Sequence, residues 1–194
     1  MMKVYMKKLI LVVAFLAVFC FPALAEDSGI WFTFGIDLLG SADGITAKDS
    51  SDDLVFGYNL GLGWAPFIGE ENILRAGFGT SFGFLNRLKD DEYAAVRMSN
   101  LAIYGTTVLH LGDIQVRLNL GYSRPFFSDA PGEGVTREKL EFNDVKGGLY
   151  FAVGLGYDLA DGIFVEAMYN KHKWSLDDRG KGHKHFTIAL GAWF

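Results

Sequence analysis

Hydrophobic and polar residues alternate with a period of two along most of the chain. In the segment 54–64, the large side chains Leu62 and Trp64 share one face, whereas Gly61 and Gly63 share the other. A period of two is typical of β-strands whose two faces meet different surroundings. The pattern therefore predicts an all-β protein with few amphipathic helices.

The alternation predicts eight strands, most of them about 9–13 residues long. They are expected at 30–38, 54–64, 73–85, 98–110, 114–124, 147–159, 163–171 and 185–194. Strands of soluble sheets typically have about 5–6 residues, whereas a tilted strand that crosses a membrane needs about 9–11. The predicted lengths therefore favour strands that span a lipid bilayer.

The connections between these strands alternate in length. The short ones are 65–72, 111–113 and 160–162, and the long ones are 39–53, 86–97, 125–146 and 172–184. An even number of strands, with short turns at one end and long loops at the other, is the layout of bacterial outer-membrane barrels. Since lipid tolerates no open sheet edge, the strands must close. The sequence thus predicts an eight-stranded antiparallel transmembrane β-barrel.

Charged residues gather in or beside the long connections. Apart from Arg124 and Lys171, the last residues of their predicted strands, five lie within predicted strands, each on the face with small or polar side chains: Asp37, Arg75, Arg117, Asp158 and Glu166. A charge that faces hydrocarbon near the midplane costs about 2–4 kcal/mol, so these residues should face the lumen. Buried charges must pair, and eight strands enclose little space. We expect an ion-paired plug, with a narrow polar path for a small solute as the alternative.

A soluble lipocalin-like barrel would also have eight alternating strands, but its apolar face would point inward. Here aromatic side chains crowd the apolar face and glycines occupy much of the other, so we expect small residues inside and bulky ones outside. Aromatic residues near the strand ends should form the girdles typical of membrane barrels. They are Trp64, Tyr157 and Phe194 at the short-turn end, and Phe84, Tyr122, Tyr169 and Phe186 at the other.

Residues 1–25 have the features of a secretory signal peptide. Three lysines precede an apolar run at 9–21, and an Ala-x-Ala cleavage motif ends at Ala25. The run is shorter than the roughly 20 residues that a spanning helix needs. We therefore expect residues 26–194 to form the barrel domain. The single cysteine, Cys20, falls in this leader, so the chain cannot form an internal disulfide.

Composition excludes two further classes of protein. Half of the 194 residues are hydrophobic and 15% are aromatic, which is too apolar for a disordered chain. The formal net charge is −5, which is the wrong sign for a general nucleic-acid binder. We expect no nucleic-acid partner.

The last predicted strand carries a resemblance to known proteins. Its apolar residues alternate back from the terminal aromatic: Phe186, Ile188, Leu190, Ala192 and Phe194. This pattern resembles the C-terminal signal that the barrel-assembly machinery reads in outer-membrane barrels. The segment 154–169 is similar to the "GxGY…E-x-x-Y" hairpin of small OmpA-like and OmpW-like barrel domains.

The resemblance implies the outer membrane of a diderm bacterium and no particular activity. It implies outer-membrane lipids, the barrel-assembly machinery and periplasmic chaperones as partners. The long loops should face the outside, because both termini lie at the short-turn end and the chain is delivered from the periplasm.

Candidate chemistry is concentrated in the predicted loop 172–184. One candidate resembles the His-x-Ser motif of PagL-type lipid A deacylases: His172 and Ser175, with Glu166 as the carboxylate. The spacing differs, because this histidine and serine are three residues apart and not two. A serine nucleophile needs a base within hydrogen-bond reach. We therefore expect no catalytic residues, and a lipid A acyl hydrolase is the least favoured alternative.

Two histidines near the C-terminus raise the question of a metal. His183 and His185 would share a face of a strand, and with Asp177 or Asp178 they could hold an ion. Without a third fixed ligand this set is weak. We expect exposed loop histidines, no metal and no cofactor.

Taken together, these patterns predict a small non-enzymatic outer-membrane barrel. Its surface-exposed loops would have a structural, adhesive or surface-interaction role, with an extracellular ligand as a candidate partner. The alternative is OmpW-like transport of a small or hydrophobic solute across the outer membrane.

Overall fold

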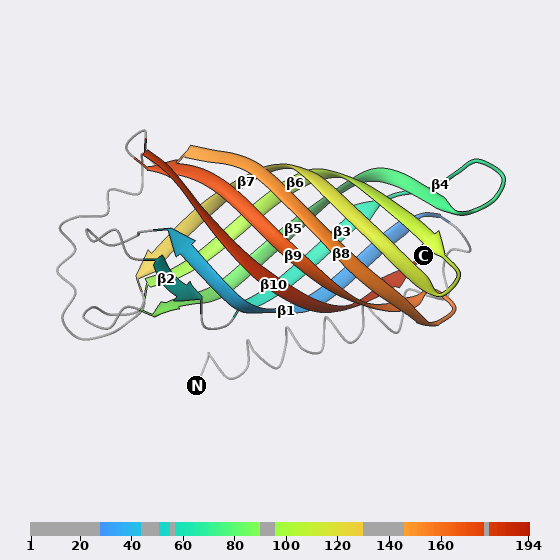
Figure 1. Ribbon diagram of the computed structural model, residues 1–194, viewed down its shortest axis with the longest axis horizontal. Helices are drawn as coiled ribbons and strands as arrows, with labels where there is room; N and C mark the ends of the chain where they lie inside the picture. Colours follow the sequence, from blue (N-terminus) through green and yellow to red (C-terminus); the bar gives the residue numbers. More distant parts are fainter. Residues whose placement is uncertain (1–27, 44–50, 55–56, 90–95, 130–145, 177–178) are drawn as a thin grey trace.

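The computed structural model describes six stretches of the chain, namely residues 28–43, 51–54, 57–89, 96–129, 146–176 and 179–194. Within them the protein is all-β and forms one antiparallel sheet that closes into a barrel (Figure 1). No helix in these stretches is long and apolar enough to cross a membrane. The predicted signal peptide lies outside the described residues.

Eight long strands make the wall of the barrel, which confirms the predicted fold class. They are β1 (Ile30–Asp43), β3 (Gly57–Trp64), β5 (Leu74–Lys89), β6 (Val96–Leu111), β7 (Ile114–Asp129), β8 (Lys146–Ala160), β9 (Ile163–Leu176) and β10 (Arg179–Trp193). Two short strands extend the sheet, β2 (Ser51–Leu54) beside β1 and β5, and β4 (Phe67–Ile68) beside β5.

The first and last strands close the barrel. β1 pairs antiparallel with β10, with Trp31 opposite Trp193 and Leu38 opposite Phe186. The hydroxyl of Ser28 donates to the carbonyl of Phe194 at 2.5 Å, so the two ends of the barrel segment meet at the short-turn end. Closure pairs the backbone of the long strands on both sides, as a lipid environment requires.

The turns at this end are tight because glycine supplies the left-handed backbone that they need. Gly112, between β6 and β7, has a φ of 66°, and Gly162, between β8 and β9, has a φ of 73°. Positive φ at a two-residue hairpin turn matches the twist of the flanking strands.

At the opposite end the strands are longer than the sequence analysis expects. β9 continues to Leu176 and β10 begins at Arg179, so the prediction of a long loop over 172–184 is wrong. The alternation of faces simply continues: His172 and Trp174 are buried, whereas Lys171 and Lys173 are exposed. We call this end of the barrel the long-loop end. Here β9 meets β10, and residues 90–95 and 130–145 connect their strands.

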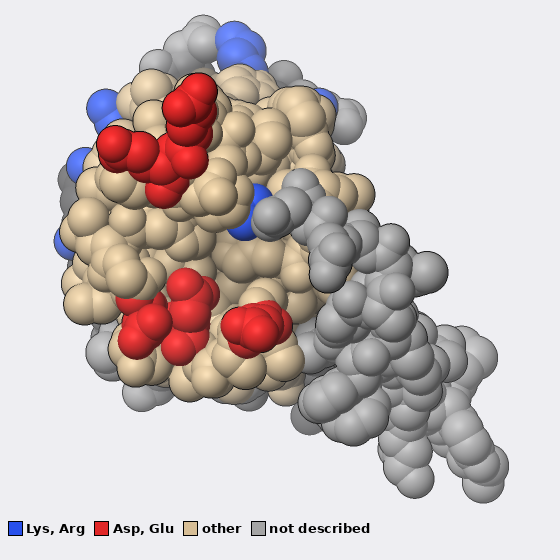
Figure 2. Space-filling model, turned by 90° about the vertical axis from the view of Figure 1, so that its right-hand side faces the viewer, with Lys and Arg blue, Asp and Glu red and all other residues tan. Residues whose placement is uncertain are grey.

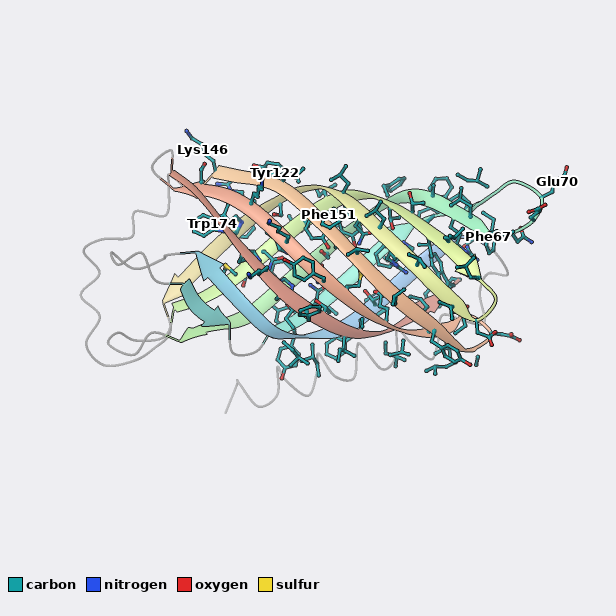
Figure 3. The ribbon with its side chains drawn as sticks, viewed as in Figure 1. Phe67, Glu70, Tyr122, Lys146, Phe151 and Trp174 are labelled. Atoms are coloured by element: carbon teal, nitrogen blue, oxygen red, sulfur yellow. The ribbon has the colours of Figure 1, made fainter. Side chains whose placement is uncertain are left out.

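The outer face of the barrel is apolar. Phe78, Ile103, Leu120 and Leu155 are each more than half exposed. A lipocalin-like barrel would direct these side chains inward, so that alternative is wrong. Aromatic residues flank the apolar band, with Trp64 and Tyr157 exposed at the short-turn end and Phe186 exposed near the other. Tyr122 is also exposed near that other end (Figure 3). Phe84, Tyr169 and Phe194 are half-buried.

The interior holds more aromatic side chains than expected. Trp31, Tyr104, Tyr150, Phe164 and Trp193 are all buried in the core. The expectation of small residues inside and bulky ones outside is therefore only partly correct.

The interior glycines explain how these rings fit. A Cβ at Gly63 would lie 2.7 Å from the ring of Trp31, and one at Gly79 would lie 2.6 Å from it. At Gly191, a Cβ would lie 2.3 Å from the ring of Phe164. The glycines thus make room for large rings within a narrow barrel.

Candidate functional site in the barrel lumen

The five charged residues that the sequence places in the lumen lie at different depths. Arg117 and Glu166 meet at its centre, where they are 2% and 6% exposed. The Nε atom of Arg117 lies 3.1 Å from Oε2 of Glu166. Taking two charges out of water is costly, and only a close pair offsets that cost.

Aromatic rings surround this ion pair. The guanidinium of Arg117 lies 4.5 Å from the ring centroid of Trp31 and 5.4 Å from those of Phe164 and Trp193. Cations are attracted to the faces of such rings, most strongly when water is excluded. We call Arg117, Glu166, Trp31, Phe164 and Trp193 the central plug.

Arg75 lies closer to the short-turn end. Its guanidinium stacks 3.6 Å from the ring centroid of Phe67 and 4.4 Å from that of Trp193, and its Nη1 donates to the carbonyl of Ala65 at 3.4 Å. Arg75 is thus joined to the central plug through the shared ring of Trp193.

Asp158 sits near the same rim and is partly exposed. Its carboxylate accepts a hydrogen bond from the Nε2 group of Gln115, and it lies 3.9 Å from Nδ1 of His110. The structure does not bring Asp158 to the Arg117–Glu166 pair.

Asp37 lies on the other side of the central plug, at the end of a buried chain of hydrogen bonds. Tyr150 donates to Asn170 at 2.8 Å, Asn170 donates to Thr187 at 2.9 Å, and Thr187 donates to Asp37 at 2.6 Å. The same carboxylate oxygen lies 3.4 Å from Nε2 of His185. This network fixes the Asp37 carboxylate against β10.

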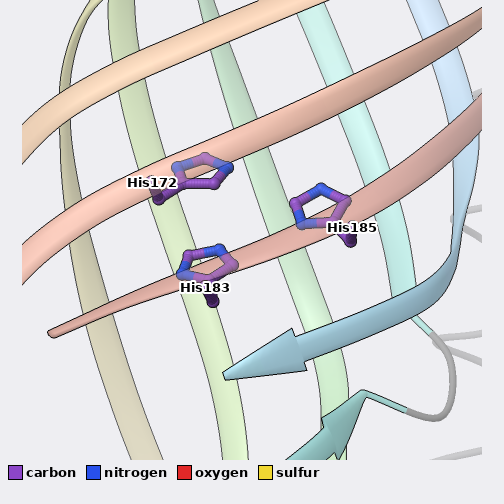
Figure 4. A group of neighbouring side chains, drawn as sticks. All are labelled: His172, His183 and His185. Atoms are coloured by element: carbon purple, nitrogen blue, oxygen red, sulfur yellow. The ribbon is translucent and has the colours of Figure 1, made fainter. Parts of the chain in front are cut away.

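Three histidines meet above this network, at the long-loop end. His172, His183 and His185 are 2%, 3% and 1% exposed, and their rings are nearly parallel, with centroids 4.1–5.5 Å apart (Figure 4). The expectation of exposed loop histidines is therefore wrong. The β9–β10 pairing continues through this region and places His172 directly opposite His183. Asp177 and Asp178, the suggested partners, are not among the described residues.

One signal in the sequence could have revealed the third histidine. Glu166, Met168 and Asn170 alternate on the inner face of β9, and His172 is the next residue in that series. Because the predicted strand stops at residue 171, the prediction does not place His172 on the inner face beside His183 and His185.

The suggested hydrolase pair is not assembled in the structure. His172 points into the lumen, whereas Ser175 lies three residues further along the same strand and so belongs to the opposite face. Glu166 is engaged by Arg117. These three side chains therefore form no nucleophile–base arrangement.

The proposed C-terminal assembly signal lies on β10 and just beyond it. Phe186, Ile188 and Leu190 are exposed on the outer face, Ala192 is buried, and Phe194 is half-buried. The backbone N–H of Phe194 donates to the carbonyl of Ile30 at 2.8 Å. The role of these residues in assembly stays a prediction.

Among the described residues, the exposed charges near the two ends of the barrel differ in sign. At the short-turn end, acidic side chains gather around the rim (Figure 2), and Glu70, Glu71, Asp113 and Asp161 are exposed there. Towards the long-loop end, the exposed residues of the outer face include four cations: Arg124, Lys171, Lys173 and Lys184.

A closed eight-stranded antiparallel barrel with an apolar outer face and a polar, filled interior defines the class of small outer-membrane barrels. In agreement, residues 11–194 match the family model of the outer membrane protein beta-barrel domain, and the chain belongs to this family. The family and the fold place the protein in the outer membrane. No curated protein matches the sequence.

Several solved structures of small barrels are similar to this chain. Neisserial surface protein A matches with a TM-score of 0.56 and 13% identity, over 88% of this chain and 100% of that one. The attachment invasion locus protein Ail of Yersinia pestis matches with a TM-score of 0.48 and 17% identity, over 84% of this chain and 99% of that one. The outer membrane enzyme PagL matches with a TM-score of 0.49 and 16% identity, over 83% of this chain and 98% of that one. At such low identities the likeness concerns the fold alone.

Proposed function

We propose that this protein is a non-conducting, non-enzymatic barrel whose role resides at its long-loop end, in a structural, adhesive or surface interaction. The observation that carries this proposal is the central plug. Arg117 and Glu166 pair at 3.1 Å, and three aromatic rings pack around the guanidinium. An interior packed in this way favours a closed lumen, which is usual for eight strands.

The difference in charge supports an orientation with the long-loop end outside. Short turns face the periplasm in barrels of this type. The outward cations Lys171, Lys173 and Lys184 lie towards the opposite end, where anionic lipid headgroups would attract them. The acidic rim at the short turns offers no such attraction.

Recordings from planar bilayers test the proposal. Folded wild-type protein should give no resolved unitary steps, while a classical porin in the same bilayers shows that conductance can be detected. Steady unitary conductance that changes with Arg117→Ser or Arg75→Ser would overturn the plug. Transport of a small solute would then be the better assignment.

Lipid A analysis tests the non-enzymatic part. Mass spectrometry of lipid A from cells with and without the protein should give the same acyl composition. Loss of one acyl chain only in cells that contain the protein would replace the proposal with an acyl hydrolase.

A further inference from the structure

We propose that His172, His183 and His185 bind one divalent transition-metal ion, with Zn²⁺ the best fit, at the long-loop end of the lumen. The site involves none of the residues of the central plug.

The histidines are already close enough to share an ion. Each ring offers one nitrogen, and these three atoms lie within 4.8 Å of one another (Figure 4). Two nitrogens on one tetrahedral zinc, with bonds of about 2.0–2.1 Å, stand about 3.3 Å apart. The rings are stacked nearly parallel, so binding requires χ1 and χ2 rotations that bring the nitrogens together and turn their lone pairs toward one ion. The backbone positions permit this, because His172 and His183 face each other across paired strands and His185 lies on the same face of β10.

The ring nitrogens need a partner. Nδ1 of all three histidines is buried and has no hydrogen-bond partner within the described part of the chain. Buried polar atoms are rarely left in this state, and each one that is calls for an explanation. A metal ion that accepts the lone pairs of these nitrogens supplies the missing interaction.

Asp37 provides the support that metal-binding histidines usually have. Such a histidine donates its second ring N–H to a carboxylate or carbonyl, which fixes the tautomer and the orientation of the ring. The Asp37 carboxylate lies 3.4 Å from Nε2 of His185, although neither ring nitrogen makes a hydrogen bond in this arrangement. When the ring turns toward an ion, Nε2–H can donate to Asp37, which leaves Nδ1 for the ion. Thr187 and Asn170 hold the carboxylate in turn, at 2.6 Å and 2.9 Å along the chain of hydrogen bonds.

The ligand set indicates the kind of ion. Imidazole nitrogens suit zinc, copper and nickel, whereas calcium and magnesium prefer oxygen ligands. Three histidines leave a fourth position on a tetrahedral ion for water. Copper(II) should also bind, because it forms the most stable complexes in the divalent series.

The position of the site gives it a structural consequence. His172 belongs to β9, His183 and His185 to β10, and Asp37 to β1, so the site bridges the pairing of β1 with β10 that closes the barrel. That pairing has a register shift between Leu38 and Ser41, just beyond Asp37. A bound ion would tie the long-loop end of the barrel together across this seam.

The test uses the full chain, without an affinity tag, folded in detergent micelles. Equilibrium dialysis and competition with a chromophoric chelator should give one Zn²⁺ per chain. His172→Gln, His183→Gln and His185→Gln should each lower the affinity by more than Asp37→Asn does, and Asp37→Asn should lower it about 10–100-fold. His110→Gln is the matched control, since His110 is the only other histidine and should leave binding unchanged.

Two further measurements distinguish specific metal coordination from non-specific metal binding and from misfolding of the variants. Co²⁺ should give the visible spectrum of a tetrahedral nitrogen site, and the three glutamine variants should lose it. His183→Phe keeps a flat ring against His172, so it should fold, as judged by migration on unheated gels, and should not bind. Absence of binding by the wild type at millimolar Zn²⁺ would overturn the proposal, as would equal binding by the triple glutamine variant.

Discussion

Arg117 and Glu166 illustrate how single residues determine whether a narrow barrel is open or filled. Both side chains are almost fully buried, and their separation of 3.1 Å makes each one the main partner of the other's charge. The rings of Trp31 and Phe164 lie 4.5 Å and 5.4 Å from the guanidinium. Because the pair lies away from bulk solvent, removing one partner leaves the other as an unpaired buried charge.

This arrangement predicts a large loss of stability on Arg117→Ala. The Glu166 carboxylate would stay buried without its partner, and breaking a buried pair in this way costs about 3–5 kcal/mol. The midpoint of urea unfolding in detergent should fall clearly. Arg117→Met combined with Glu166→Gln is the control, and it should recover most of the loss because neither position then carries a charge that lacks its partner. An unchanged midpoint in Arg117→Ala would mean that the pair is solvated.

The interior glycines give a second prediction at this scale. Gly79→Ala should destabilise the barrel, because the new Cβ would lie 2.6 Å from Trp31 and 2.9 Å from Tyr104. Overpacking of this kind typically costs about 1–3 kcal/mol. Gly180→Ala in β10 is the control, since a Cβ there meets nothing within 4 Å. Equal unfolding midpoints for the two variants would contradict the packing argument.

Among the elements, the β9–β10 hairpin differs most from its sequence-based prediction. The charged and polar residues over 171–184 suggest a loop, yet those whose side chains the structure describes, over 171–174 and 183–185, alternate between the lumen and the outer face. Polar side chains are tolerated on both faces here because the strands lie beyond the apolar band, near headgroups and water. The hairpin thereby carries both the outward cations and the buried histidines.

The connections between elements allow the orientation of the barrel to be tested. An epitope tag inserted after Gly132, in the connection between β7 and β8 that lies outside the described residues, should be labelled on intact cells. A tag in the Gly112–Asp113 turn should be labelled only after the outer membrane is permeabilised. The reverse result would place the short turns outside.

At the scale of the whole molecule, closure by β1 and β10 gives the barrel its stability in lipid. The long strands pair around a complete ring, so their backbone groups are satisfied without water. The outer face then presents hydrocarbon side chains to the membrane.

A closed barrel of this kind should resist unfolding by detergent. The protein should fractionate with outer membranes and migrate faster on an unheated SDS gel than after boiling, because the folded barrel is compact. A matched sample unfolded in urea before loading should migrate like the boiled one. Release in the soluble periplasmic fraction would contradict membrane integration.

The sequence by itself determined the architecture, because the side-chain alternation of a strand is local information. Leu62 and Trp64 against Gly61 and Gly63 are enough to predict a strand with one lipid face, and the short turns around Gly112 and Gly162 set the order of the strands. The inward direction of Arg117 and Glu166 follows from the same parity.

Only the tertiary structure decided which inward residues meet. The contacts of Arg117 with Glu166 and Trp31 join residues on three strands that are distant in the chain, and their relative heights depend on strand tilt and register. The meeting of His172 with His183 and His185 likewise depends on how far the β9–β10 pairing extends. Periodicity assigns a face to each residue, but depth in the barrel and neighbours across the lumen arise only when the sheet closes.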